Sequence, residues 1–506
     1  MDESVAPAPV VAGRSLRLSK SKFLSGLQCH KRLYLEIFQP QLATPPDAGT
    51  QAILNMGTEV GELARQRFAG GRLVTAGYRQ TEEALAQTSV LLADESVPAI
   101  YEAAIFADGV LVRVDVLERV TVDGGTAGWR LIEVKSSTRV KDVHLDDLAL
   151  QYHVLRKAGL EVVGCHLMHV DTGYLYPGGE VELEKLFAIE DVAAAVLERC
   201  GTVPERLSAI KAMLATGSLP LIEPDQHCLT PYECPFWQHC TKDKPTRWIY
   251  YLPGKKDIVM RLVEQGITII DDIPDSTKLT DVQSKVKKNA EWVSAKLGPV
   301  LKSVIYPVHH LDFETVMLAV PRYASTRPYQ SIPVQWSNHI ESESGEIVHH
   351  EFLHAEASEP RKRWAEALIE SLGEQGSIVV YSAYEEAIMR QLVEAFPEFR
   401  SAFKGIVQRL WDLHPVIKDH YYHPGFNGSY SIKAVLPAVV PSLGYGDLSI
   451  QEGGHAASEY YRLVFVETDW VEKERIREAL LAYCKRDTLA MVELRRALKE
   501  KAGEQH

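Results

Sequence analysis

The sequence predicts an α/β protein with two α/β modules joined by a helical middle segment. Its 506 residues are too many for one hydrophobic core, so two or three domains are expected. Strand-like runs, a helical segment and a further strand follow one another between residues 72 and 170. The same kind of alternation returns between residues 306 and 499, and helical periodicity dominates the stretch between the two.

The first module is expected over residues 15–245, after a segment, residues 1–14, whose Ala, Pro, Val and Gly content predicts disorder. Helices are predicted near residues 50–69 and 145–158, and residues 182–220 are expected to be helical throughout. Alternating apolar runs separated by Gly-containing turns predict strands at residues 72–76, 99–107, 109–120, 129–137 and 161–170.

The middle segment, residues 246–302, contains the run KDIVMRLVEQGITIIDDIP, which resembles a helix-hairpin-helix element with Gly266 in its turn. The second module is expected over residues 303–500. Its predicted elements are a strand ending in HHLDFET, a hairpin, helices starting near residues 360 and 385, a strand SIVVYSA, and a closing helix over 471–499.

Composition limits the classes of protein that fit. A run of about 18 apolar residues is lacking and the N-terminus has no secretory pattern, so a cytoplasmic protein with no membrane contact is expected. The net charge of −13 argues against nucleic acid as a partner, but a local basic track can bind phosphates on an acidic protein. One such track, or else a solvated helix face, comprises Arg14, Arg17, Lys20, Lys22, His30, Lys31 and Arg32.

Two carboxylates and a lysine occupy neighbouring predicted strands of the first module. Asp115 lies in VRVDVLERV, while Glu133 and Lys135 lie two residues apart in LIEVKSS and share one face of their strand. Paired carboxylates can hold Mg²⁺ or Mn²⁺, and a nearby lysine can stabilise negative charge on a phosphate. The alternative is a surface ladder of ion pairs.

This pattern resembles the PD-(D/E)XK nucleases, a restriction-endonuclease-like fold, and within them the RecB-like branch, over residues 17–245. The resemblance implies catalytic roles for Gln151 and Tyr152 on the following helix. Related nucleases often carry a metal-binding His in the first helix, in a G-x-x-x-H pattern, but here a second glycine, Gly61, takes that position. The candidates to fill the vacancy are Glu59, Glu62 and Glu102.

Seven cysteines without a signal sequence do not indicate a disulfide framework. Three are isolated and expected to be small buried hydrophobes: Cys165, Cys200 and Cys484. The others could hold zinc or an iron–sulfur cluster, and they are Cys29, Cys228, Cys234 and Cys240. One distant cysteine plus a triplet resembles the iron–sulfur RecB-like nucleases, including the CRISPR-associated adaptation nucleases. That resemblance implies a 4Fe–4S cluster that clasps the two ends of the domain.

The second module carries acids at both of its ends. Asp312 and Glu314 close an apolar strand, and Tyr483 and Asp487 share one face of the closing helix. These pairs resemble the first and third motifs of the DEDDy exonucleases, which have an RNase H-like, DnaQ-type fold. The resemblance implies four carboxylates that hold two Mg²⁺ or Mn²⁺ ions and a tyrosine that positions the attacking water.

The middle acid of that pattern is expected to be Glu385, a Glu in place of the usual Asp, with Glu386 as the alternative register and Asp412 as a further contributor. The module also resembles an uncharacterised domain commonly fused to RecB-like nucleases, on the runs RPYQSIPVQWSNH and GSYSIK at residues 327–339 and 428–433.

These features predict a metal-dependent nuclease that cleaves DNA at single strands or ends, in repair, recombination or defence. Gly266 and nearby lysines would grip phosphates, and Trp237, Trp248 and Tyr250 would stack on bases unless they belong to the core. The alternative is a catalytically decayed protein that binds nucleic-acid ends or acts as a scaffold. RNA as substrate, cleavage polarity and a helicase partner stay open.

Overall fold

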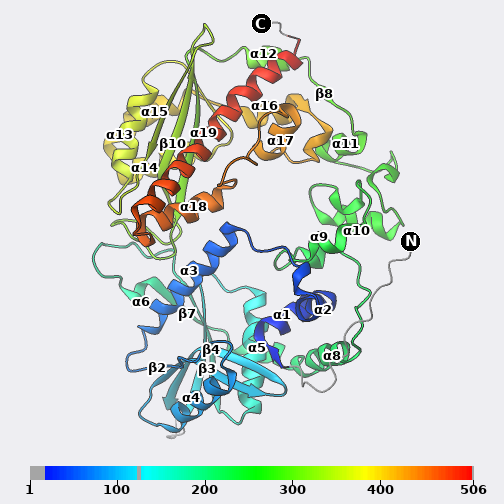
Figure 1. The fold of residues 1–506 in the computed structure, drawn as a ribbon, viewed down its shortest axis with the longest axis vertical. Helices are drawn as coiled ribbons and strands as arrows, with labels where there is room; N and C mark the ends of the chain where they lie inside the picture. The colour runs from blue at the N-terminus through cyan, green and yellow to red at the C-terminus, as the bar shows by residue number, and fades with distance from the viewer. Residues whose placement is uncertain (1–16, 122–126, 504–506) are drawn as a thin grey trace.

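The computed structural model describes residues 17–121 and 127–503 and has a mixed α/β fold, as the sequence predicts. The first module lies at the bottom of Figure 1 and the second at the top, with the middle segment along one side. The expected disordered segment and Arg14 lie outside the described residues. Among the described residues, no helix is both long enough and apolar enough to cross a membrane.

The first module is built on a sheet with the strand order β2-β3-β4-β5-β6-β7, and β1 pairs with β4. The central strands form an antiparallel meander, after which helix α5 crosses over to β6, which runs parallel to β5. The strands are β1 Leu18–Ser19, β2 Arg72–Leu73, β3 Ala99–Ala107, β4 Val110–Thr121, β5 Ala127–Lys135, β6 Val162–Val170 and β7 Phe187–Asp191.

Alternation along β4 determines which face of the sheet meets the core. Val110, Val112 and Val114 are completely buried, whereas Arg113 and Asp115 between them keep partial exposure. Helices α4 and α5 pack on the face that carries these three valines, and α3 packs on the opposite face, toward the second module. The helices are α1 Lys20–Gln28, α2 His30–Phe38, α3 Ala48–Arg65, α4 Thr81–Ala93, α5 Asp142–Lys157, α6 Leu183–Leu186, α7 Ala193–Cys200 and α8 Val203–Ala215.

One local expectation is wrong, and one helix was not predicted. Residues 187–191 form the edge strand β7 and not a helix, because Phe187 is buried and the strand pairs with β6 from Phe187–Val170 to Asp191–His166. Helix α4 was not expected, although its buried Ala84 and Thr88 lie four residues apart on one helix face.

The short helix α9, Trp237–Thr241, ends the first module, and the middle segment is made of the short helices α10 Lys256–Glu264, α11 Asp281–Lys288 and α12 Leu297–Leu301. Gly266 adopts a φ of 80° directly after α10, but the second half of the expected helix-hairpin-helix is only a 3-10 turn at Ile270–Asp272. Trp248 is buried, with its ring centroid 4.5 Å from that of Tyr250 and 6.1 Å from that of Trp237. These aromatic rings therefore pack on one another.

The second module is built on a sheet with the order β11-β10-β9-β12-β13, in which β10 is antiparallel to β9 and β11, while β12 and β13 run parallel to β9. Helices α13, α14 and α15 cover one face, and the long helix α19 crosses the other (Figure 1). The strands are β9 Val308–Met317, β10 Ser331–Glu341, β11 Ile347–Leu353, β12 Ser377–Val380 and β13 Leu410–Asp412. The helices are α13 Arg361–Leu372, α14 Tyr384–Ala395, α15 Arg400–Val407, α16 Leu413–His420, α17 Ile432–Val439, α18 Gly453–Tyr461 and α19 Trp470–Lys501.

Candidate functional site

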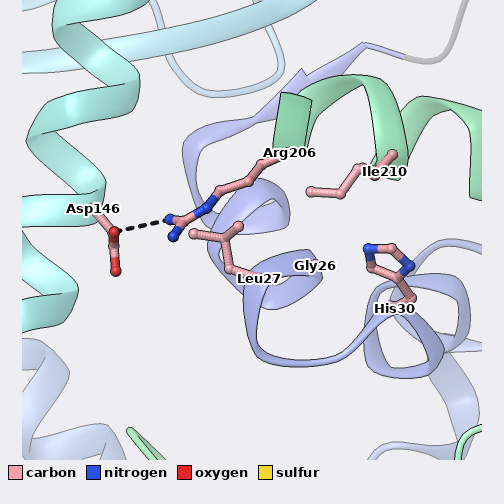
Figure 2. Close-up of a pocket in the computed structure, with 7 residues that line it drawn as sticks. Gly26, Leu27, His30, Asp146, Arg206 and Ile210 are labelled. Carbon is pink, nitrogen blue, oxygen red and sulfur yellow. Dashed lines mark hydrogen bonds and ion pairs between the residues drawn. The ribbon is translucent and has the colours of Figure 1, made fainter. Parts of the chain in front are cut away.

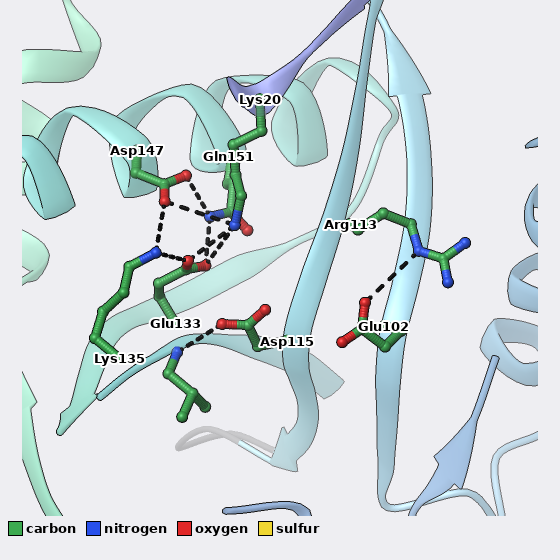
Figure 3. Close-up of polar contacts among 9 residues, drawn as sticks. Lys20, Glu102, Arg113, Asp115, Glu133, Lys135, Asp147 and Gln151 are labelled. Carbon is green, nitrogen blue, oxygen red and sulfur yellow. Dashed lines mark hydrogen bonds and ion pairs between the residues drawn. The ribbon is translucent and has the colours of Figure 1, made fainter. Parts of the chain in front are cut away.

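The first cluster of polar groups forms where β4 and β5 separate. Their pairing ends at Val116–Ile132, and beyond it the backbone N–H of Val134 donates to the Asp115 carboxylate at 2.8 Å. Glu133 extends from the same stretch of β5 toward α5, where the side-chain amide of Gln151 donates to its carboxylate at 2.7 Å. The structure thus brings together Asp115, Glu133, Lys135 and Gln151 (Figure 3).

Two members of this cluster were not predicted as site residues. Lys20, at the start of α1, lies 2.8 Å from a carboxylate oxygen of Glu133, and Lys135 lies 2.5 Å from the same oxygen. Asp147, one turn before Gln151 on α5, lies 3.1 Å from the Lys135 ammonium. Spacing of four residues on a helix already links Asp147 to Gln151, so the sequence carried this signal.

The buried acids and lysines of the first cluster shift one another's pKa values. Burial and the neighbouring Glu133 carboxylate raise the pKa of Asp115 to about 7. Burial alone would raise the pKa of Glu133, but Lys135 and Lys20 outweigh it and hold that pKa below its usual value. Burial would lower the pKa of Lys20, but Asp147 and Glu133 hold it well above its usual value. Glu133 is therefore ionised and paired, while Asp115 is the acid that titrates near neutrality.

Tyr152 lies apart from this cluster. Its ring packs against the apolar core, and its charged neighbours include Arg156 and the thiols of Cys165 and Cys200. Burial raises the pKa of Tyr152, so its hydroxyl stays protonated. Tyr152 points away from the cluster because Gln151 points into it, and consecutive residues of a helix point about 100° apart.

The three candidates for the missing first-helix His lie in different places. Glu59 accepts from Arg322 and from the Tyr461 hydroxyl, and Glu62 is exposed. Glu102 lies between two β3 residues that pair with Val114 and Val116, and therefore stands opposite Asp115. Its φ of 56° marks an irregularity in β3, and its carboxylate also contacts Arg65 at 3.1 Å (Figure 3 shows its pairing with Arg113).

Acids pair with part of the expected basic track. Arg17 pairs with Glu82 at 2.6 Å, and Arg32 pairs with Glu36 at 2.8 Å. His30 lines a cavity of about 370 Å³ between α1, α5 and α8, where Arg206 and Asp146 pair with each other at 3.2 Å (Figure 2). The arginines of this region thus form ion pairs within the fold.

The second cluster lies at the carboxyl ends of the parallel strands of the second module. Asp312 and Glu314 come from β9, Glu385 from the first turn of α14 after β12, and Asp487 from α19. Glu385 and Asp487 are buried, whereas Asp312 and Glu314 keep partial exposure. Opposite Glu314, a bulge on β10 between Pro333 and Gln335 shifts the register, as often happens beside functional sites.

Burial raises the pKa values of the four acids, and neighbouring negative charge adds to this for Asp312, Glu314 and Glu385. Burial, then the charges of Asp487 and Glu314, raise the pKa of Asp312 well above its usual value. Burial and Asp487 do the same for Glu314. Burial also raises the pKa of Glu385 to about 7 and that of Asp487 to about 6. The cluster therefore holds closely spaced carboxyl groups that a positive charge would stabilise.

Two tyrosines and a lysine close the second cluster. The Tyr445 hydroxyl donates to Asp487 at 2.5 Å. The Lys433 ammonium lies 5.3 Å from the ring centroid of Tyr483 and 5.6 Å from that of Tyr445, and it lowers the pKa of Glu314 and, together with Arg486, that of Asp487. Lys433 lies within the GSYSIK run, but the sequence did not assign a role to it or to Tyr445.

Cys484 belongs to this cluster and is not merely a small core residue. Its sulfur lies 3.9 Å from an oxygen of Asp312, and ligand atoms of Asp312, Glu314 and Cys484 all lie within 4.8 Å of one another. These three residues could hold a metal ion. Burial raises the pKa of the Cys484 thiol well above its usual value, so the carboxylates are the stronger ligands for a hard cation.

The two alternatives for the middle acid, Glu385 and Glu386, lie on different faces of α14. Glu385 turns inward, where the Ser382 hydroxyl donates to it at 3.3 Å. Glu386 pairs with Arg390 one turn along the exposed side of α14. Asp412 ends β13 and caps α16 by accepting from the His414 N–H at 2.9 Å, close enough to Glu385 to raise its pKa.

The four predicted cysteine ligands gather between α1, α2 and the loop before α9. Cys29 is the residue between α1 and α2, and the side-chain amide of Gln28 next to it donates to the His227 and Tyr232 carbonyls at 2.7 Å, beside the cysteine loop. The N–H of Cys234 donates to the Cys228 carbonyl at 2.7 Å. Burial raises the pKa of Cys234 to about 11, and Arg32 opposes it.

Comparisons with known proteins add a partial family match. A family model described as a domain of unknown function, DUF2779, matches residues 309–431. That range contains three acids of the second cluster and ends before Asp487. No curated protein matches the chain. A solved structure titled "Crystal structure of SSO0001" is similar with 15% identity and a TM-score of 0.20, covering 46% of this chain and 90% of that chain.

Proposed function

We propose that the chain is a cytoplasmic, divalent-cation-dependent nuclease whose principal site is the second cluster. The observation that carries this proposal is the convergence of four acids from β9, α14 and α19 beside Tyr483. Strand order and direction in that module support an RNase H-like, DnaQ-type fold. The meander, crossover helix and parallel strand of the first module support a PD-(D/E)XK, RecB-like fold.

The two clusters differ in how well their own residues balance the charge of their acids. In the first, Lys20 and Lys135 stand against Asp115, Glu133 and Asp147, which leaves one excess negative charge when all are ionised. In the second, Lys433 acts on Glu314 and Asp487, and Arg486, which also pairs with Asp447, acts on Asp487, so the four acids keep at least two excess negative charges. Carboxylates a few ångströms apart repel strongly, so the second cluster has the greater need for Mg²⁺ or Mn²⁺.

Each residue of the second cluster has a definable task. Asp312, Glu314, Glu385 and Asp487 would hold Mg²⁺ or Mn²⁺, and Tyr445 fixes the orientation of Asp487. A bound divalent cation lowers the pKa of a water ligand and offsets charge on the scissile phosphate. The Tyr483 hydroxyl, protonated because burial raises its pKa, would orient that water. Lys433 can contact a phosphate oxygen.

A 4Fe–4S cluster fits the cysteine group better than a single zinc ion. The four cysteines are one distant residue, at the junction of α1 and α2, plus a triplet over residues 228–240, and not two close pairs as zinc sites usually have. This arrangement favours the cluster. Ligation would join α1 and α2 to the loop before α9 and release protons from the buried thiols.

The first module has a second candidate function. Because Lys20 and Lys135 already neutralise Glu133 and Asp147, this cluster could serve as a binding site for nucleic-acid ends without cleavage. The substrate we propose is DNA, at single strands or ends and in repair, recombination or defence, with RNA as the alternative and a helicase as a candidate partner.

One assay tests the proposal. Protein purified without oxygen is incubated with Mn²⁺ or with EDTA, using single- and double-stranded DNA and RNA labelled at either end. We expect Mn²⁺-dependent shortening of DNA from one end, which Asp312→Asn abolishes while any product of the first cluster remains. Cleavage that survives both EDTA and Asp312→Asn, or binding without any cleavage, would contradict the nuclease and favour the binding function.

A further inference from the structure

The second module contributes to the apolar layer on one side of β5, the strand that carries Glu133 and Lys135. On β5, these two side chains face α5, whereas Ile132 and Val134 face the opposite side. Ala319 and Val320, which follow β9 directly, are buried in the same apolar cluster as Ile132 and Val134. Strand β5 of the first module therefore packs between α5 and an apolar layer to which both α3 and a loop of the second module contribute.

Tyr329, at the end of that loop, reaches the residue next to Lys135. Its hydroxyl donates to the backbone carbonyl of Ser136, and its ring packs in the shared apolar cluster. Tyr329 adopts a left-handed φ of 59°, and its N–H donates to the Leu318 carbonyl at 2.8 Å. A non-glycine residue in this conformation has its side-chain direction fixed by its surroundings.

Other contacts hold the loop in place. Its Ser325 N–H donates to the Tyr176 carbonyl at 2.7 Å, and the Tyr176 N–H donates back to Thr326 at 2.9 Å. Arg322 pairs with Glu59 on α3, which also accepts from the Tyr461 hydroxyl of the second module at 3.2 Å. Backbone and side-chain bonds thus secure residues 318–330 against the first module.

We propose that Tyr329 is a positioning residue for the first cluster, supplied across the interface by the second module. By holding the Ser136 carbonyl, it fixes the end of β5 and so the placement of Lys135 beside Glu133. Only three residues separate Glu314 from Leu318, where the loop begins, so the same β-hairpin that carries the second cluster stabilises the first. The proposal rests on the proposed function only where cleavage is the readout.

Hydrogen–deuterium exchange on the full chain tests the positioning role without any activity. Tyr329→Phe keeps the ring and removes the donor, and Tyr461→Phe is the matched control that removes an interface hydroxyl not bonded to β5. We expect amides of residues 131–137 to exchange about 3- to 10-fold faster in Tyr329→Phe, as loss of one hydrogen bond implies. Val320→Ala should loosen the same peptide. Equal exchange in both tyrosine variants would overturn the proposal.

Cleavage supplies the second readout, in an Asp312→Asn background that silences the second cluster. Tyr329→Phe should lower kcat several-fold and leave KM unchanged, because it displaces Lys135 without removing a substrate contact. Faster exchange with an unchanged kcat would overturn the positioning role. Faster exchange in a background whose first cluster never cleaves would support the contact with β5 and contradict only the proposed nuclease activity of the first module.

Discussion

At the scale of single residues, the number of lysines beside each acid cluster decides what that cluster can bind. Glu133 has two lysines within 2.8 Å of one oxygen, so its charge is satisfied inside the fold. Asp312 has no such partner among its main charged neighbours, which are Asp487, Glu314 and Glu385. The sequence showed both sets of acids but not this difference, because Lys20 comes from a helix more than a hundred residues away from Glu133.

Metal binding should be visible in thermal unfolding. Mn²⁺ should raise the Tm of the full chain, and Asp312→Asn should lose most of that gain, because one carboxylate no longer holds the cation. Without metal, Asp312→Asn should be no less stable than wild type, since a repelling charge is removed. Asp275→Asn, which removes an exposed acid paired with Lys287, is the control and should keep the full Mn²⁺ effect.

The Tyr483 hydroxyl should matter for turnover but not for metal binding. Tyr483→Phe should keep the Mn²⁺-dependent gain in Tm while slowing cleavage at the second cluster by about 10²-fold, as expected for loss of one group that orients water. Rates under saturating Mn²⁺ measure this. A variant that loses the Tm gain as well would show that the hydroxyl supports the carboxylates and not the water.

The raised pKa of Glu385 predicts how stability depends on pH without metal. Its pKa is about 7 in the folded chain against an ordinary 4.5, so the folded state binds the proton more tightly than the unfolded state. Stability is therefore fully present below about pH 4.5 and is lost as pH rises toward 7. Glu385→Gln should remove this loss, gaining up to about 3 kcal/mol at pH 8 relative to pH 4.5.

Denaturant unfolding in EDTA at several pH values measures this difference. The neighbouring Glu386→Gln is a matched control, because Glu386 lies on the exposed side of α14 and pairs with Arg390. It should show no such gain. The same stability difference between Glu385→Gln and wild type at pH 4.5 and at pH 8 would contradict the buried, protonated Glu385.

At the scale of elements, periodicity identified most of the long helices and the buried strands but missed the 13-residue helix α4 and the edge strand β7. The predicted closing helix over 471–499 is α19, Trp470–Lys501, because a long amphipathic pattern is strongly determined by its own sequence. Strand β7 and helix α4 were missed because pairing with β6 and packing on β3 determine them, and neither is a local property. The site residues followed the same rule, since Asp115, Glu133 and Asp487 lie on long elements, whereas Tyr445 lies in a loop.

The cysteine loop is an element whose stability should depend on its ligand. Protein purified without oxygen should be brown, and Cys234→Ser should bleach it and destabilise the first module by several kcal/mol, since ligand binding contributes folding free energy. Absorbance and iron content measure the cluster, and thermal unfolding measures the loss. Cys200→Ser, at the end of α7, is the control and should stay brown. Colourless protein with one zinc per chain would contradict the 4Fe–4S assignment.

At the scale of the whole molecule, the interface between the modules makes them one mechanical unit. Helix α3 belongs to the first module by sequence, yet the backbones of Gly49 and Gly454 approach so closely that an added side-chain carbon would lie 3.4 Å away. Figure 1 shows α3 extending from the first module toward α18. A substitution in one module can therefore alter the other, and variants that separate the two activities must leave the packing intact.

Glu133→Gln and Asp312→Asn meet that condition better than alanine changes do. Glu133 is buried, so Glu133→Ala would leave two lysines without their shared partner and cost several kcal/mol, whereas Gln keeps an oxygen that can accept from Gln151.

With Mn²⁺, each single variant should lose one DNA cleavage product and keep the other, and the double variant should lose both. End-labelled substrates resolve the two. If Glu133→Gln leaves every product unchanged while Asp312→Asn removes them all, catalysis belongs to the second module alone. The lysine-paired cluster of the first module would then act in binding.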